Sequence, residues 1–248
     1  MKTLALICEG VSETKILTYI INRYLGDGIV VNPIQPSLKT AHGQQKQASE
    51  GGWMQVLNHC SDDIIQDIMA ANDYLVVQID TDACIQANYD VDIYDDNHRK
   101  VSDDILYERV CTRLKRNISG EIWDKYAGRV LFAVCINETE CWLLPIYCEN
   151  DVKKRCATTN CIYILNQKLQ SEGSGIPEDK KNTPEAVKVY QQILKRMKRK
   201  DIPQIAQHNF GFRKFVEGLE VVKGSTKYRI SSADALIRLK ASVSCPDL

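Results

Sequence analysis

The sequence predicts an α/β fold with a central, mostly parallel sheet flanked by helices. Three apolar runs read as buried strands, and each of them stops at an acidic residue. The runs and the acids that follow them are 4–8 with Glu9, 74–79 with Asp80, and 129–136 with Glu138. Helical patterns separate the strands, as in β-α-β units. Because ligand sites of such sheets lie at the carboxyl edge, we expect a carboxylate cluster there, which is typical of a divalent cation site.

The first strand leads directly into a helix. Gly10 turns the chain, and apolar residues at helical spacing predict a helix that runs from Ser12, as N-cap, to Leu25. Glycines end this helix, and 29–34 then reads as a short strand in which a proline favours the sheet edge. The chain therefore opens with a β-α-β unit.

The middle of the chain alternates polar loops and helices. Residues 37–52 are polar and predict an exposed loop, and 53–71 predict a helix in two pieces broken near Cys60. Residues 83–104 are strongly acidic but lack the central glycine of a calcium loop, so we interpret them as an insertion. Ser102 is the expected cap of the helix that follows, to about residue 117.

Charge divides the chain into two regions. Residues 1–150 carry 22 Asp and Glu against 13 Lys and Arg, a balance of −9, whereas 151–248 carry 10 against 19, a balance of +9. We expect a catalytic domain over 1–150 and a basic, mainly helical region over 151–248 that packs on it. An acidic half beside a basic half fits a metal site paired with a polyanion surface, and ordinary solvated faces are the alternative.

The basic region contains several expected helices. Thr183 and Pro184 form a cap-and-proline helix start, and two further helices are expected near 210–219 and 233–239. The helix from Thr183 ends in a run of cations, which suits either a nucleic-acid backbone or a solvated helix end. The nucleic-acid-binding residues predicted from this run are Lys195, Arg196, Lys198 and Arg199.

Composition narrows the class of protein. No apolar run approaches the roughly 20 residues that cross a bilayer, and the start of the chain does not read as a signal peptide. The ten cysteines form no CxxC pair, and zinc is not expected. The nearest cluster has irregular gaps and no nearby histidine: Cys141, Cys148, Cys156 and Cys161. We therefore expect a cytoplasmic protein that does not contact a membrane and whose cysteines are reduced thiols.

The acidic strand ends resemble those of a known family. Glu9-Gly10 with Glu13 in the next helix, followed by Asp80-x-Asp82, is similar to the TOPRIM fold of topoisomerases, DnaG-type primases and OLD-family nucleases. Small standalone TOPRIM-like proteins of the nucleotidyl transferase/hydrolase type are a closer likeness. They have a glutamate before Trp-Leu-Leu, matched by Glu140, and a short helix matched by 209–215. The resemblance covers about residues 1–148 and implies a Rossmann-like sheet.

The resemblance implies metal-assisted cleavage of phosphodiesters in DNA or RNA. Asp80 and Asp82 would anchor one or two Mg²⁺ or Mn²⁺ ions, and Glu9 would be a further ligand or a general acid or base. Glu13 would also serve the metals, and Glu140 would complete the cluster from the third strand. A role in bacterial antiphage defence is implied as well. The alternative is a catalytically weak regulatory or binding subunit of an ATPase complex, and the sequence leaves open whether the chain forms a homodimer.

Overall fold

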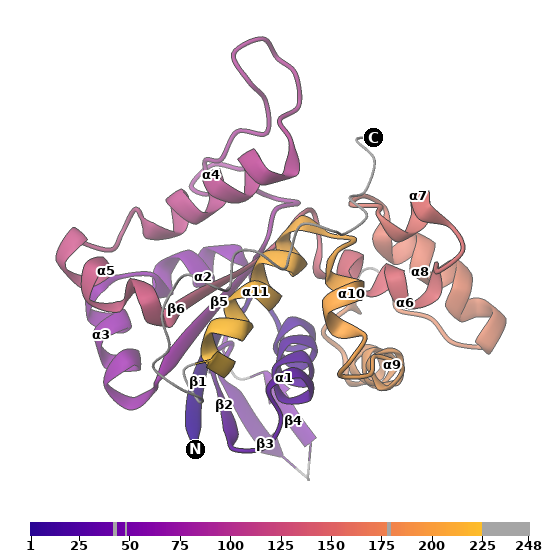
Figure 1. Cartoon of the computed structure of the whole chain (residues 1–248), viewed down its shortest axis with the longest axis horizontal. Helices are drawn as coiled ribbons and strands as arrows, with labels where there is room; N and C mark the ends of the chain where they lie inside the picture. Colours follow the sequence, from indigo (N-terminus) through magenta and orange to yellow (C-terminus); the bar gives the residue numbers. More distant parts are fainter. Residues whose placement is uncertain (42–43, 48, 178–179, 225–248) are drawn as a thin grey trace.

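The centre of the protein is a four-stranded parallel sheet with the strand order β2-β1-β5-β6 (Figure 1). The computed structural model describes residues 1–41, 44–47, 49–177 and 180–224. The strands are β1 (Lys2–Ile7), β2 (Ile29–Gln35), β5 (Tyr74–Asp80) and β6 (Val130–Cys135). This arrangement confirms the predicted α/β class with its parallel sheet, and Pro33 lies in an edge strand as expected.

Side chains of the inner strands alternate between two separate cores. Leu4 and Leu6 of β1 pack on one face with α1 (Val11–Leu25), whereas Ala5 and Ile7 pack on the other. Helix α11 (Phe210–Gly224) also covers the first face, at β6, while α9 (Pro184–Lys195) packs on α1 and α8 (Cys161–Leu169) joins the same cluster of buried residues. The second face is covered by α2 (Trp53–His59), α3 (Asp62–Ala71), α4 (Asp103–Lys115) and α5 (Gly120–Tyr126). Burial on both faces explains why these strands read as unbroken apolar runs.

The strand order places a crevice beside the end of β1. From β1 the chain crosses to β2 on one side, and it later returns to pair β5 on the other side of β1. Such a reversal of strand order separates the loops that leave the two neighbouring strands and opens a crevice at their carboxyl ends. The acids that follow β1 and β5 therefore meet at this point.

Two details of the amino-terminal half differ from the sequence prediction. The stretch 37–52 is not simply a loop, since it contains an antiparallel hairpin of β3 (Leu38–Ala41) and β4 (Gln44–Gln47). Gly10, and not Ser12, is the N-cap of α1, because Ser12 already lies within the helix and its hydroxyl donates to the carbonyl of Lys181. The helix over 53–71 is broken into α2 and α3 at the predicted place.

The described part of the carboxyl-terminal region is mainly helical and contributes to one of the two cores. Helices α9 and α11 pack with α1 and β6 in the same cluster of buried residues. The bounds are η2 (Thr139–Leu143), α6 (Leu144–Tyr147), α7 (Val152–Arg155), α8 (Cys161–Leu169), η3 (Gln170–Glu172), α9 (Pro184–Lys195), α10 (Ile202–Ala206) and α11 (Phe210–Gly224). A short helix, η1 (Ala127–Arg129), precedes β6. The helix expected over 233–239 lies outside the described residues.

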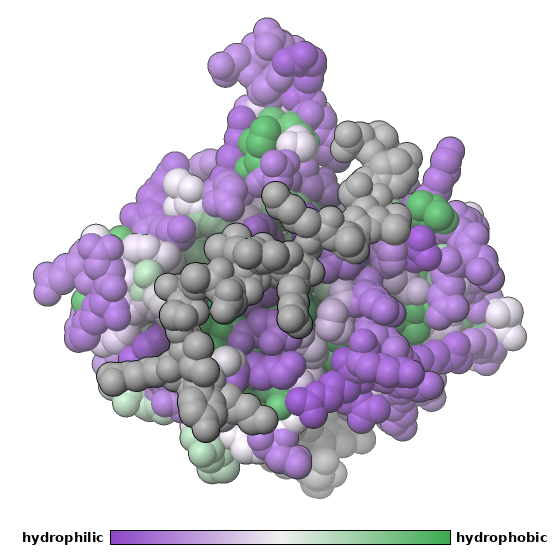
Figure 2. Space-filling model, viewed as in Figure 1, coloured by the Kyte–Doolittle hydropathy of each residue, from purple (hydrophilic) through white to green (hydrophobic). Residues whose placement is uncertain are grey.

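The described surface seen in Figure 2 is mainly hydrophilic, and its apolar areas are small and separate. The segment between β5 and α4, which contains the predicted insertion, projects from the rest of the molecule (Figure 1). None of the helices in the described part of the chain has the length and apolar character that a membrane span requires.

Candidate metal centre

Hydrogen bonds join the carboxyl ends of β1 and β5. The backbone N–H of Asp80 donates to Oε1 of Glu9 at 2.6 Å. The side chain of Gln78 lies between them, since it accepts from the N–H of Glu9 at 3.0 Å and donates to Oδ1 of Asp80 at 2.8 Å. Asp80 is 5% exposed and Gln78 is fully buried. The two acids are therefore fixed at the crevice by a network that belongs to the strands themselves.

Glu13 reaches the same place from the first turn of α1. It is 3% exposed, and its Oε2 is buried without a hydrogen-bond partner among the described residues. A Cβ atom at Gly10 would lie 2.5 Å from this oxygen and 2.5 Å from Oδ1 of Asn182, so any other residue there would displace these side chains. A buried carboxylate oxygen without a partner is costly, and a cation is the natural partner for it.

The end of β6 is tied to the end of β5. The N–H groups of Thr81 and Asp82 both donate to the carbonyl of Asn137 at 3.0 Å, and Asn137 has a positive φ of 66°. This turn leads into η2. Thr139 then donates to Oδ1 of Asp80 at 2.8 Å, which brings the fully buried Glu140 beside the acids of β1 and β5.

Lys181 lies within this group of acids. Its Nζ is 3.4 Å from Oε2 of Glu140 and 3.6 Å from Oε2 of Glu138. Burial would lower the pKa of Lys181, but the surrounding carboxylates together raise it above its ordinary value. Tyr190 of α9 donates to the other oxygen of Glu140, so both oxygens of this carboxylate have partners. These contacts join the carboxyl-terminal region to the predicted site.

The predicted acids perturb one another strongly. Burial, assisted by the charges of Glu13 and Asp82, raises the pKa of Glu9 to about 8. Burial, followed by the charge of Glu140, raises the pKa of Glu13 to about 7. The pKa of Asp80 is also raised well above its usual range, first by burial and then by Glu9. Groups that hold protons near neutral pH in a crevice are candidates for function.

The five predicted acids lie close enough to affect one another's pKa values, and we call them the acidic cluster: Glu9, Glu13, Asp80, Asp82 and Glu140. The group of described residues whose ligand atoms lie within 4.8 Å of one another is a different one, Glu138, Cys141 and Cys161. Asp82 is the most exposed member and faces solvent. Because both oxygens of Glu140 are occupied by Lys181 and Tyr190, the contacts of Glu140 favour a positioning role. That the cluster binds metal stays a prediction.

The predicted basic run lies elsewhere. Tyr190, which contacts Glu140, lies five positions before Lys195 at the end of α9, so the run begins about 7.5 Å further along the helix axis. Within the run, Arg196 pairs with Glu172 at 2.7 Å, and Arg199 donates to the carbonyl of Leu25. Lys195 and Lys198 are exposed. The run is therefore a separate surface.

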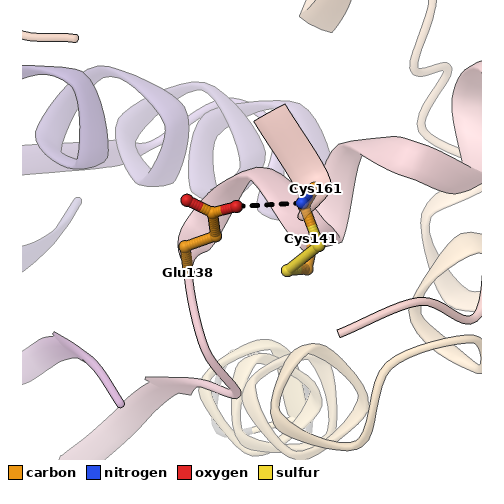
Figure 3. A group of neighbouring side chains, drawn as sticks. All are labelled: Glu138, Cys141 and Cys161. Atoms are coloured by element: carbon orange, nitrogen blue, oxygen red, sulfur yellow. Dashed lines mark hydrogen bonds between the residues drawn. A yellow bond between two sulfur atoms is a disulfide. The ribbon is translucent and has the colours of Figure 1, made fainter. Parts of the chain in front are cut away.

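The expectation that all cysteines are reduced thiols is wrong in this structure. Cys141 and Cys161 form a disulfide with a Cα–Cα separation of 5.0 Å, although 20 residues separate them in the sequence (Figure 3). Glu138 lies beside them and accepts from the N–H groups of Cys161 at 3.0 Å and Ile162 at 3.2 Å. Glu138 is therefore an acid at the N-terminus of α8, where the helix dipole favours it.

Three residues of the site were missed in the sequence. Gln78 had a readable signal, because it is a lone polar residue in an apolar strand and lies on the same strand face as Asp80. Lys181 and Tyr190 had no readable signal in the sequence, since lysines before a helix cap and tyrosines on an apolar helix face are common. The chain matches no protein-family model, and neither curated proteins nor solved structures give a match.

Proposed function

We propose that the protein is a Mg²⁺- or Mn²⁺-dependent nuclease that cleaves nucleic-acid phosphodiesters by hydrolysis. The observation that carries this proposal is the unpartnered, buried Oε2 of Glu13 in the acidic cluster. A folded chain gains nothing by burying several carboxylates in one crevice unless a cation compensates them. Oxygen ligands of this kind suit hard cations.

A TOPRIM-like identity is part of the proposal. Glu9 follows β1, Asp80 and Asp82 follow β5, and these strands are parallel neighbours at the reversal of strand order. The spacing that suggested the resemblance therefore corresponds to adjacent positions in space. Glu9, Glu13, Asp80 and Asp82 would hold the ion, while Glu140 would hold Lys181.

The residues of the cluster have distinct chemical tasks in this proposal. When bound, Mg²⁺ or Mn²⁺ polarises the phosphodiester and stabilises the charge that develops on its oxygens. Glu9 would be a further ligand of the ion, or it would accept the proton of the attacking water as the new P–O bond forms and the P–O bond to the leaving sugar oxygen breaks. Lys181 supplies a positive charge beside the reacting phosphate, and Glu140 and Tyr190 fix its position.

A polymeric substrate is supported by the basic run. Lys195 ends α9 five positions after Tyr190, which contacts Glu140 of the acidic cluster, so one nucleic-acid strand could contact both regions. The loop before α9 would then supply Lys181, and the end of the helix would supply phosphate contacts. Cleavage of nucleic acid is consistent with an effector of antiphage defence, which is a further part of the proposal.

The second candidate is a regulatory or binding subunit of an ATPase complex. The observation that favours it is Lys181, whose ammonium group already compensates part of the acidic charge without any metal. In a protein that had lost catalysis, such an ion pair would keep the crevice folded. The two candidates differ in whether metal displaces or complements this lysine.

The test is cleavage of supercoiled plasmid, single-stranded DNA and total RNA by the full chain with Mn²⁺ or Mg²⁺. We expect cleavage of at least one polymer, and we expect Glu13→Gln and Asp80→Asn to reduce it by about 100-fold or more. Asp67→Asn, an exposed acid on α3, is the matched control and should retain activity. Absence of cleavage for all three polymers with both metals would favour the regulatory subunit.

A further inference from the structure

Glu138, Cys141 and Cys161 form a second group of potential ligands, separate from the acidic cluster. One ligand atom from each lies within 4.8 Å of the others. Figure 3 shows the carboxylate of Glu138 directed at the backbone nitrogen of Cys161, with the two sulfur atoms beside it. We propose that, in the reduced state, this group binds a thiophilic divalent ion of the Zn²⁺ class, and that oxidation of the two thiols to the disulfide releases the ion.

The backbone is already placed for such a site. Zinc binds thiolate at about 2.3 Å, so two thiolate ligands at a tetrahedral angle lie about 3.8 Å apart. The Cα atoms of Cys141 and Cys161 are 5.0 Å apart, so both sulfurs can reach one ion from these backbone positions. Reduction would therefore turn the bridge into a pair of ligands.

The surroundings orient the third ligand and stabilise the thiolates. Two N–H groups of α8 hold Oε1 of Glu138, as hydrogen-bond donors hold ligating carboxylates in metal sites. Oε2, which lies 3.6 Å from Nζ of Lys181 and accepts no such bond, is the oxygen left to bind the ion. Cys161 is the first residue of this nine-residue helix, and the helix N-terminus favours the thiolate form of a cysteine.

Charge is balanced in the metal-bound form. Two thiolates and one carboxylate carry three negative charges, so binding of a divalent ion leaves a net charge of −1. Lys181, 3.6 Å from Oε2 of Glu138, compensates that charge. Cys141 and Cys161 are at most 1% exposed, whereas the side chain of Glu138 is 14% exposed, so the ion enters on the glutamate side, where a water can complete the coordination.

The redox step balances with common thiol reagents. A dithiol reduces the bridge by disulfide exchange, which yields two thiols and the oxidised reagent. Binding of the ion then releases the two thiol protons. In the reverse direction the two thiolates give two electrons to hydrogen peroxide, which takes up two protons and becomes two water molecules. Thiolate ligands select Zn²⁺ over Mg²⁺, so this site is chemically independent of the proposed nuclease centre.

The experiment uses Co²⁺ as a spectroscopic probe of the full chain. The protein is first reduced with a dithiol, and the dithiol is then removed under anaerobic conditions. We expect thiolate-to-cobalt charge-transfer absorption at one equivalent, competed by Zn²⁺ and lost after peroxide. Cys141→Ser and Cys161→Ser should abolish it, and Glu138→Gln should weaken binding by about tenfold or more. Cys148→Ser, at a buried free thiol, is the matched control and should retain the absorption. Asp80→Asn should retain it as well, which separates this proposal from the nuclease.

A second measurement does not depend on the variants folding. Zn²⁺ should protect Cys141 and Cys161 of the reduced wild-type protein from alkylation, as read by peptide mass spectrometry. Absorption that persists in folded Cys141→Ser and Cys161→Ser, or equal alkylation of both cysteines with and without Zn²⁺, would overturn the proposal.

Discussion

The Nζ atom of Lys181 lies 3.4 Å from Oε2 of Glu140, a carboxylate that is fully buried. The two residues are 41 positions apart, and they join the loop before α9 to the turn after β6. This ion pair makes the helical region part of the acidic cluster. It also means that one cation of the chain occupies the place where the charge of the acids is concentrated.

Replacement of Lys181 tests this role. Lys181→Met leaves Glu140 with only Tyr190 as a partner, so we expect the metal-free protein to lose about 2–4 kcal/mol of its free energy of unfolding. Saturating Mn²⁺ should restore part of this loss, because an ion that binds only the folded state stabilises it by about 2.7 kcal/mol at 100 times its Kd. Urea denaturation in EDTA measures the loss of stability, and urea denaturation in Mn²⁺ measures how much of it the ion restores. The exposed neighbour Lys180→Met should change stability by less than about 0.5 kcal/mol, and an equal effect of the two variants would refute the ion-pair role.

We expect Glu13 to lower the stability of the metal-free protein and to strengthen metal binding. Glu13→Gln removes the charge of a buried oxygen that has no partner, so the metal-free protein should gain about 1 kcal/mol at pH 8. The same variant should bind Mn²⁺ at least about tenfold more weakly, as calorimetry can measure. Glu108→Gln, at an exposed position on α4, should change neither quantity. Unchanged Mn²⁺ affinity in Glu13→Gln would exclude this residue as a ligand.

The raised pKa values predict an unusual pH dependence of the metal-free protein. Glu9 and Glu13 shift from 4.5 to about 8 and about 7, so between pH 5 and pH 7 the folded state holds protons that the unfolded state has lost. The free energy of unfolding must then fall as pH rises, by up to about 1.4 kcal/mol per pH unit for each group. Mn²⁺ needs the deprotonated carboxylates, so its affinity should rise over the same range.

Denaturation in EDTA at pH 5, 6, 7 and 8 measures this slope. The Glu9→Gln/Glu13→Gln double variant is the control, since it lacks both titrating groups and should lose most of the decline. If wild type and double variant show the same slope, the shifts do not arise from these two glutamates.

The acids of the first two strand ends could be predicted because their signals are local. An apolar run of strand length that stops at an acid fixes where the side chain lies in a parallel sheet, and Glu9 and Asp80 follow this rule. Glu13 follows from helical spacing, since it lies in the first turn after Gly10. Gln78 also had a local signal, because it is a polar residue in an apolar strand, two residues before Asp80. It was not predicted because the strand was interpreted only as a buried apolar run.

The other contacts of the site have no local pattern. Tyr190 contacts Glu140, 50 positions away, and Cys141 is bonded to Cys161, 20 positions away. Both contacts depend on how helices pack against each other, and the spacing of apolar residues does not reveal that packing. The hairpin of β3 and β4 was not predicted for another reason. Its strands are short and polar, so they show no alternation of apolar residues, and only their backbone hydrogen bonds identify them as strands.

The basic run predicts a minimum substrate length. A substrate that reaches from the acidic cluster to Lys195 and Lys198 spans several phosphates, so a mononucleotide should bind much more weakly than a nucleic-acid strand. Lys195→Gln/Lys198→Gln should lower the slope of log K against log salt by about 1.8 on duplex DNA. Fluorescence anisotropy at several salt concentrations measures this, with Lys125→Gln on α5 as control. An unchanged slope would assign the run to a solvated helix end.

Gly10 tests the packing of the crevice itself. Its φ of −146° suits any residue, so the constraint is purely steric: a Cβ would lie 2.5 Å from Oε2 of Glu13 and from Oδ1 of Asn182. We expect Gly10→Ala to displace Glu13, to cost about 1–3 kcal/mol, and to weaken Mn²⁺ binding. Gly120→Ala is the matched control, because a Cβ there meets nothing within 4 Å and the helix should gain about 0.4–1 kcal/mol. If Gly10→Ala binds Mn²⁺ as tightly as the wild type, Glu13 tolerates displacement and is not an essential ligand.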